Sequence, residues 1–265
     1  MITAENATKR FGDITAVDHV CAEVRDGSVY GLIGSNGAGK STLMKLMMGL
    51  IRPESGQVLL NGRLTAELPK EELGRTISMV YQNPEEMFIK DSIRKDIEYA
   101  MKVRRVEEYE KHTDELLEMF RLTDLQDRDG RLLSGGQMRR ASLAIGIALQ
   151  PEILLLDEPT ANLDIATRRE IMKTLQMLKG VTDTVVIATH DMQLVCDWAE
   201  RLIVLSSGYV IADGTKEEIF ADMYVRQQVG IRPPQIYDMG RALGIENPCF
   251  TIDEFMGYFR GERYA

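Results

Sequence analysis

The segment 34–41, which reads GSNGAGKS, constrains the possible folds of this 265-residue chain more than any other feature. It follows a short apolar run at 28–33, predicted as a strand, and it opens a predicted helix at 40–50. Glycines let the backbone curl so that its N–H groups surround an anion, and the helix N-terminus adds partial positive charge. The spacing G-x-x-x-x-G-K-[ST] between a strand and a helix therefore predicts a phosphate-binding loop rather than an ordinary glycine-rich turn.

Such a loop predicts a nucleotide together with a metal ion. Lys40 is expected to reach the β- and γ-phosphates of ATP, and the Ser41 hydroxyl is expected to bind Mg²⁺. The residues expected to bind the nucleotide in this segment are Ser35, Asn36, Gly37, Ala38, Gly39, Lys40, Ser41 and Thr42.

The rest of the chain alternates between strand and helix patterns, which predicts an α/β core. Short apolar runs predicted as strands lie at 17–24, 57–60, 76–81, 153–156 and 184–188. Apolar spacing is helical from Ser92 to about Leu122, which predicts a helical insert at roughly 88–140. The last stretch, about 225–265, carries prolines around two short helix-like segments and is predicted to be a small extension.

Composition and charge narrow the possible functions. The net charge of −9 disfavours general nucleic-acid binding, which usually leaves a basic footprint. Cys21, Cys196 and Cys249 lack the spacing of a disulfide framework or a metal site, so buried, reduced thiols of a cytosolic protein are expected. No apolar run reaches the roughly 18 residues of a spanning helix, and the N-terminus lacks a signal-peptide pattern. Any role at a membrane is therefore expected to be peripheral.

Two carboxylates, Asp157 and Glu158, follow the apolar strand at 153–156. Buried parallel strands of open α/β sheets deliver ligand-binding residues at their carboxyl ends. Asp157 is therefore expected to hold Mg²⁺, and Glu158 to orient or deprotonate the attacking water. A solvated acidic pair at a strand end is the alternative for these two residues in isolation, and the phosphate loop favours the catalytic interpretation.

A second glycine-rich segment, Leu133–Gln137 (LSGGQ), precedes a predicted helix at 138–149. A serine with two glycines at a helix start predicts another anion site, with a simple helix cap as the alternative. Together with four other motifs, this segment makes the chain resemble the ATP-binding-cassette (ABC) ATPases. The motifs occur in the order of that family over about residues 1–222, and the other four are GSNGAGKS at 34–41, LLDE at 155–158, ANLD at 161–164 and THD at 189–191.

The resemblance implies an α/β P-loop NTPase core with an antiparallel β subdomain, the helical insert and a short C-terminal extension at 223–265. It implies that two chains pack head to tail around two ATP molecules, in a homodimer or a heterodimer. In the chain's own site, besides the phosphate loop, the resemblance implies Gln82 at the Mg²⁺ and attacking water, His190 at the γ-phosphate and Phe11 stacked on adenine. Across the interface it implies Asp164, together with four residues that contact the nucleotide of the other chain, namely Ser134, Gly135, Gly136 and Gln137. For Phe11 a place in the core, and for His190 a structural role, are the alternatives.

Within this family the chain resembles the ATPases of energy-coupling-factor importers for vitamins or transition-metal ions. The resemblance rests on the segments 82–88 (QNPEEMF), 189–192 (THDM), 210–215 (VIADGT) and 230–235 (GIRPPQ), while Asn162 stands where that group often has Gly. It implies a peripheral subunit on the cytoplasmic face of the cell membrane, bound to transmembrane subunits and not to nucleic acid. The alternatives are an exporter or a binding-protein-dependent importer, and a cassette ATPase with no role in transport.

The segment Pro84–Ile89 is predicted to pass ATP-driven movement to the membrane partner, because it joins Gln82 to the helical insert. Met87 and Phe88 are expected to be exposed apolar side chains of a groove for a partner helix. The alternative is that Phe88 packs beneath the insert.

Overall fold

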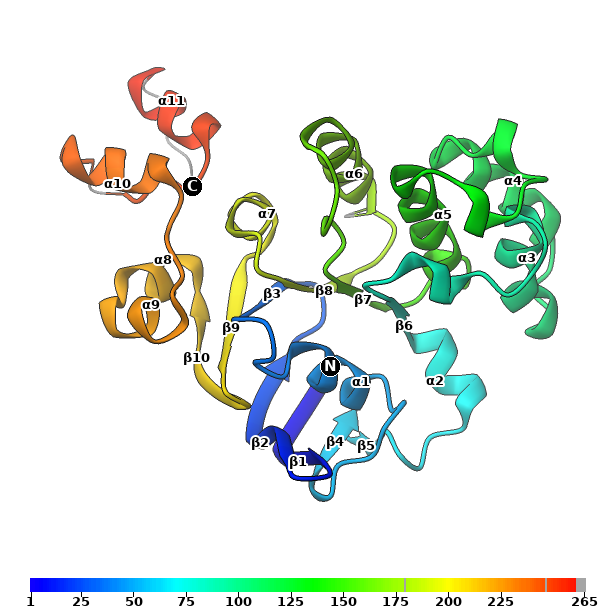
Figure 1. Ribbon diagram of the computed structural model, residues 1–265, viewed down its shortest axis with the longest axis horizontal. Helices are drawn as coiled ribbons and strands as arrows, with labels where there is room; N and C mark the ends of the chain where they lie inside the picture. Colours follow the sequence, from blue (N-terminus) through cyan, green and yellow to red (C-terminus); the bar gives the residue numbers. More distant parts are fainter. Residues whose placement is uncertain (179, 246, 261–265) are drawn as a thin grey trace.

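The computed structural model of the protein describes residues 1–178, 180–245 and 247–260. The chain forms two β-sheets, and helices lie around the central sheet and extend to both sides of it (Figure 1). The architecture is the α/β fold predicted from the sequence.

The central sheet has six strands in the order β10-β9-β3-β8-β7-β6. All pairs are parallel except β9 with β10. The strands are β3 (Val29–Ile33), β6 (Ile77–Val80), β7 (Ile153–Asp157), β8 (Thr184–Thr189), β9 (Arg201–Ser206) and β10 (Tyr209–Thr215). Every residue of β3, β7 and β8 is buried, as expected for parallel strands with both faces covered. Their carboxyl ends therefore meet at one edge of the sheet.

The second sheet is antiparallel, in the order β2-β1-β4-β5. Its strands are β1 (Ile2–Phe11), β2 (Ile14–Val24), β4 (Ser55–Leu60) and β5 (Arg63–Leu64). Its inner face and one face of the central sheet bury α1 (Lys40–Met47) in a common apolar core. This sheet is the expected antiparallel β subdomain, and it forms one wall behind the phosphate loop.

The helical insert lies at one end of the central sheet, beyond β6 (Figure 1). The predicted helical stretch from Ser92 to Leu122 is two helices, because the chain turns through left-handed backbone at Arg105 (φ 54°) and Glu108 (φ 52°). The helices between β5 and β7 are α2 (Lys70–Thr76), which precedes β6, and then η1 (Pro84–Met87), α3 (Ile93–Val103), α4 (Tyr109–Met119), η2 (Thr123–Leu125), η3 (Gly130–Leu132) and α5 (Gly135–Ile147). Helix α5 runs continuously through residue 140, where the insert was expected to end.

The remaining helices are α6 (Ile165–Leu178), α7 (Met192–Trp198), α8 (Lys216–Ala221), α9 (Met223–Val229), α10 (Gln235–Ala242) and α11 (Ile252–Arg260). Tyr237 and Phe250 pack against Phe220 of α8 in a cluster of three aromatic rings. The centroid of Phe250 lies 5.5 Å from that of Phe220 and 5.4 Å from that of Tyr237. Among the described residues, every helix is too short or too polar to cross a membrane.

Phe88 does not have the exposed position that was expected for it. Its side chain is 6% exposed and belongs to the apolar core of the insert. A Cβ atom placed on Gly130 would lie 2.4 Å from the Phe88 ring, so the ring packs flat against that glycine. The next residue, Ile89, is the exposed one at 67%. The sequence of the loop does not indicate whether Phe88 or Ile89 points inwards. The space left by Gly130 accommodates the ring of Phe88.

This packing predicts opposite effects for the two neighbours. Phe88→Asp should destabilise the purified chain by about 3 kcal/mol or more, because it buries a charge where a ring was packed. Ile89→Asp is the matched control and should leave the midpoint of urea unfolding close to that of the wild type. Equal midpoints for the two variants would contradict the buried position of Phe88.

The three thiols differ in exposure, which corrects the expectation that all are buried. Cys21 is exposed, while Cys196 and Cys249 are buried. Burial raises the pKa of Cys196 to about 12, and burial also raises the pKa of Cys249. A thiol reacts as its thiolate, so one thiol per chain should react rapidly with Ellman's reagent at about pH 8, and Cys21→Ser should abolish that rapid phase. A rapid phase that persists in Cys21→Ser would contradict this assignment.

Candidate functional site

A cavity of about 370 Å³ lies at the carboxyl edge of the central sheet, against the phosphate loop. It brings together most of the residues that the sequence predicts for the nucleotide and its metal ion. Its lining includes Asn36, Gly37, Gly39, Lys40, Ser41, Thr42, Gln82, Asp157 and Glu158, together with Ile14, Thr15 and Ala16 of β2.

The phosphate loop needs glycine at Gly39, where the chain enters α1. Its φ of 106° lies in the left-handed region, and a Cβ atom there would lie 2.4 Å from the Ala16 carbonyl oxygen. The next residue, Lys40, is buried and its Nζ donates to the carbonyls of Gly34 (2.8 Å) and Ser35 (3.2 Å). Burial lowers the pKa of Lys40, and the Glu158 carboxylate opposes that shift most strongly. The loop thus places the Lys40 ammonium group beside backbone that can surround an anion such as phosphate.

Asp157 supplies a carboxylate that suits a hard cation. Its side chain is buried and its Oδ1 atom has no hydrogen-bond partner. Burial raises the pKa of Asp157, and a hydrogen bond from Ser41 opposes that shift. A buried, unpartnered carboxylate oxygen beside a hydroxyl is the kind of oxygen donor set that Mg²⁺ prefers, so the residues present fit this ion.

Glu158 is held in place by the end of the neighbouring strand, β8. One carboxylate oxygen accepts a hydrogen bond from Thr189 Oγ1 (3.1 Å), and the other lies 2.9 Å from His190 Nδ1. The same oxygen as in the histidine contact lies 3.9 Å from Lys40 Nζ. The backbone of Glu158 is left-handed (φ 46°), a conformation that costs about 1–3 kcal/mol for a residue other than glycine. The residue lines the cavity at the phosphate loop.

The LSGGQ segment lies outside the cavity that contains Lys40 and Glu158. Ser134 precedes the first residue of α5, and its N–H donates to the Gln137 side-chain oxygen (3.1 Å). Gly135 and Gly136 form the first positions of that helix, where backbone N–H groups lack partners within the helix, and neither glycine lines the chain's own nucleotide cavity. Within one chain, therefore, the LSGGQ segment does not line the cavity of the phosphate loop.

Two further predicted residues also lie apart from the cavity lining. Phe11 ends β1 and is 51% exposed, with Lys9 Nζ 5.6 Å from its ring centroid, so it is not a core residue. Asp164 accepts hydrogen bonds from Thr167 N (2.9 Å) and Oγ1 (2.7 Å) at the start of α6, and these bonds lower its pKa.

The structure adds residues that the motifs did not single out. The Asp191 carboxylate accepts from Arg168 (2.5 Å) and from Thr160 (3.1 Å), and so joins both ends of the 161–164 loop to the residue after His190. Asn162 in this loop has φ 59°, a backbone that asparagine tolerates, which explains how it can stand at a position where glycine is common. Sequence spacing gave no signal for these long-range pairs.

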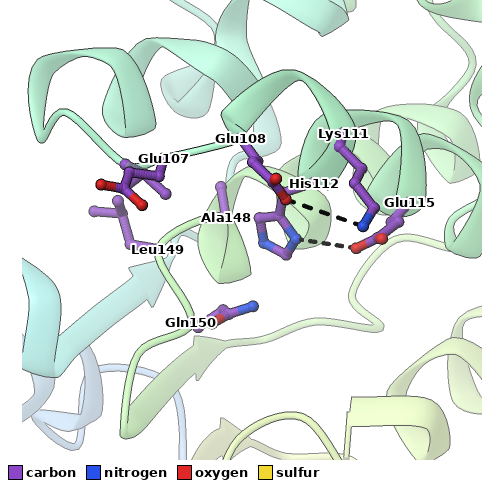
Figure 2. A pocket seen from close by; sticks show the side chains of 9 residues that line it. Glu107, Glu108, Lys111, His112, Glu115, Ala148, Leu149 and Gln150 are labelled. Carbon is purple, nitrogen blue, oxygen red and sulfur yellow. Dashed lines mark ion pairs between the residues drawn. The ribbon is translucent and has the colours of Figure 1, made fainter.

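A second cavity, of about 250 Å³, lies between α4 and the end of α5 (Figure 2). Its charged lining consists of Glu107, Glu108, Lys111, His112 and Glu115, and it contains none of the predicted site residues. Lys111 faces Glu108 and His112 faces Glu115, so the excess carboxylate repels phosphate. This cavity therefore lacks the phosphate-binding features of the cavity at the phosphate loop.

Comparisons with known proteins agree with this geometry. Residues 17–161 match the family described as ABC transporter. The chain is 34% identical over 253 residues to the cobalt import ATP-binding protein CbiO of Rhodobacter capsulatus, covering 94% of this chain and 90% of that protein. It is 34% identical to the energy-coupling factor transporter ATP-binding protein EcfA2 of Clostridium perfringens, covering 90% of this chain and 86% of that protein. A match to a putative ABC transporter ATP-binding protein of Enterococcus faecalis spans 44% of that relative.

Two solved structures share the fold. CbiO1 of Clostridium perfringens, part of an ABC transporter complex, gives a TM-score of 0.73 at 30% identity, covering 92% of this chain and 98% of that one. The ATP-binding cassette MJ0796, solved as a dimer bound to ADP and Pi, gives a TM-score of 0.72 at 29% identity, covering 81% of this chain and 98% of that one. With its phosphate loop, its paired carboxylates and its LSGGQ helix in one α/β core, the chain belongs to the ABC transporter family, as an ATP-hydrolysing subunit.

Proposed function

We propose that this protein powers an importer of the energy-coupling-factor type, for a vitamin or a transition-metal ion. The ATPase part of this proposal rests on the Glu158 carboxylate, which contacts Thr189 and His190 beside the phosphate loop. The importer part is supported by relatives named for cobalt import and for energy coupling, each matched over most of its length.

In this proposal each residue has a distinct task. Lys40 and the loop N–H groups bind the phosphates, and Phe11 stacks on adenine. Ser41, Gln82 and Asp157 hold Mg²⁺, which neutralises phosphate charge when it is bound. Glu158 orients the attacking water and accepts its proton. His190 contacts the γ-phosphate and orients Glu158, as its 2.9 Å contact with that carboxylate supports.

We infer that the complete site contains two chains, as a homodimer or a heterodimer. Ser134, Gly135, Gly136 and Gln137 of one chain then complete the nucleotide site of the other, and Asp164 crosses the interface. Two observations support this arrangement. The LSGGQ segment is separated from the cavity of its own chain, and the similar cassette MJ0796 was solved as a dimer with nucleotide.

The proposed complex places the chain on the cytoplasmic face of the membrane, bound to transmembrane subunits and not to nucleic acid. The segment Pro84–Ile89 remains the proposed contact, now with exposed Ile89 rather than Phe88 as its apolar side chain, beside exposed Glu85 and Glu86. Residues 1–222 form the proposed ATPase domain, and 223–265 the proposed C-terminal extension.

The assignment of Glu158 is tested by Glu158→Gln. The amide fits the same space but cannot accept a proton, so ATPase turnover should fall about 10²–10⁴-fold while ATP binding is retained. Because ATP then persists at the interface, sedimentation with ATP should show a dimer that is absent without it. Wild-type turnover in this variant would remove Glu158 from its proposed role.

The shared site is tested by mixing two inactive variants. Lys40→Ala removes the phosphate-loop half of its own site, and Ser134→Arg removes the half that each chain gives to its partner. A mixed dimer then has one site with both defects and one with neither, so ATP hydrolysis should return at the intact site. Each variant alone is the control. Mixed dimers without restored hydrolysis would count against a shared site.

A further inference from the structure

Arg139 is a buried cation that the roles given above leave unused. It lies in α5, is 3% exposed, and donates from Nη1 to the Tyr81 carbonyl (3.0 Å) and from Nη2 to the Gln82 carbonyl (2.9 Å). Its Nε atom is buried and has no hydrogen-bond partner. The two arms of one guanidinium thus hold two successive carbonyls of the loop that carries Gln82.

Burying the Arg139 guanidinium reduces the free energy of unfolding, which indicates that this residue has a function. A buried charge is usually paired with an opposite charge, whereas Arg139 donates to two neutral carbonyls. Burial lowers its pKa, and the nearby Asp157 and Glu158 carboxylates oppose that shift. Lysine is a point charge with no planar fork and cannot reproduce the double contact.

The position of Arg139 along α5 connects two anion sites. Ser134 directly precedes this 13-residue helix, and the Ser134 carbonyl accepts the N–H of Met138 (2.8 Å), the residue before Arg139. The Gln82 residue on the other side of the contact lines the cavity of the chain's own phosphate loop. Because a helix moves as a rigid element, a shift of the Gln82 backbone that acts on Arg139 also displaces Ser134.

We infer that Arg139 is a positioning residue that couples Gln82 in one nucleotide site to the placement of Ser134 and Gly136 in the adjoining site. The inference rests on the proposed function, since it requires two chains to share their sites. It adds a physical link by which the metal end of one site sets the position of the residues that close the other. ATP binding to a single chain does not depend on this link, but ATP-driven pairing of chains does.

The test is a double-mutant cycle in the Glu158→Gln background, with dimer formation at saturating ATP and Mg²⁺ as the readout. Arg139→Met and Gln82→Ala should each weaken the dimer about tenfold, within the range of coupling found inside one hydrogen-bond network. The double variant should be no weaker than either single variant, because Gln82→Ala removes the side chain through which the nucleotide site acts on this loop, and Arg139→Met removes the contact through which the loop acts on α5. ATP affinity of the single Arg139→Met chain, measured below the dimerisation concentration, should stay within about twofold of its parent.

Arg140→Met is the matched control. It removes the next arginine of the same helix, which contacts the Phe120 carbonyl (3.1 Å) and Glu170 (3.4 Å) rather than the loop of Gln82. Its dimer should be unchanged. Arg139→Lys keeps the charge and secures the test if the methionine variant unfolds, and it should weaken the dimer as methionine does, because it cannot hold both carbonyls.

Three results would overturn the inference while leaving the proposed function intact. The first is a normal dimer in both Arg139→Met and Arg139→Lys. The others are additive losses of dimer affinity in the double variant, or a loss of dimer affinity in Arg140→Met equal to that in Arg139→Met. A Glu158→Gln parent that fails to dimerise with ATP would instead overturn the shared site itself, and the inference with it.

Discussion

The structure depends on three adjacent parallel strands that are buried on both faces. Because β3, β7 and β8 run in the same direction, their carboxyl ends bring the phosphate loop, the two acids and His190 to one edge, although these residues are far apart in the sequence. The backbone hydrogen bonds between these strands fix the positions of the strand ends relative to one another. The apolar side chains of the strands thus determine the geometry of a polar site that they do not line.

Neighbouring residues at that edge acquire different chemistry from their surroundings. Asp157 continues the strand and keeps one oxygen without a partner, so it is suited to a metal ion. Glu158 leaves the strand through left-handed backbone and is held by Thr189 and His190, so its carboxylate is fixed for water. The identity of the side chains alone does not separate these tasks, since both are carboxylates. The change in backbone direction between them does.

The sequence predicted the fold class, the phosphate loop and the acidic pair, because each depends on local periodicity and on short spacing. It did not predict which side chains of irregular segments face inwards. Phe88 is buried through its contact with Gly130, which lies 42 residues away in a different turn. The hydrogen bonds from Arg139 to Gln82 and from Arg168 to Asp191 likewise join distant segments. Residue types alone do not indicate which positions of two distant segments lie next to each other.

The site also concentrates ionisable groups that the fold has to keep out of water. Lys40, Arg139, Asp157 and Glu158 are all buried, and Lys40 and Arg139 donate hydrogen bonds to backbone carbonyls. Desolvation of charges that are incompletely paired opposes folding, so the apolar cores on both faces of the sheet have to offset it. A ligand that brings phosphate to Lys40 and a cation to Asp157 completes this pairing. Its binding free energy is then added to the stability of the same strand ends that position the site.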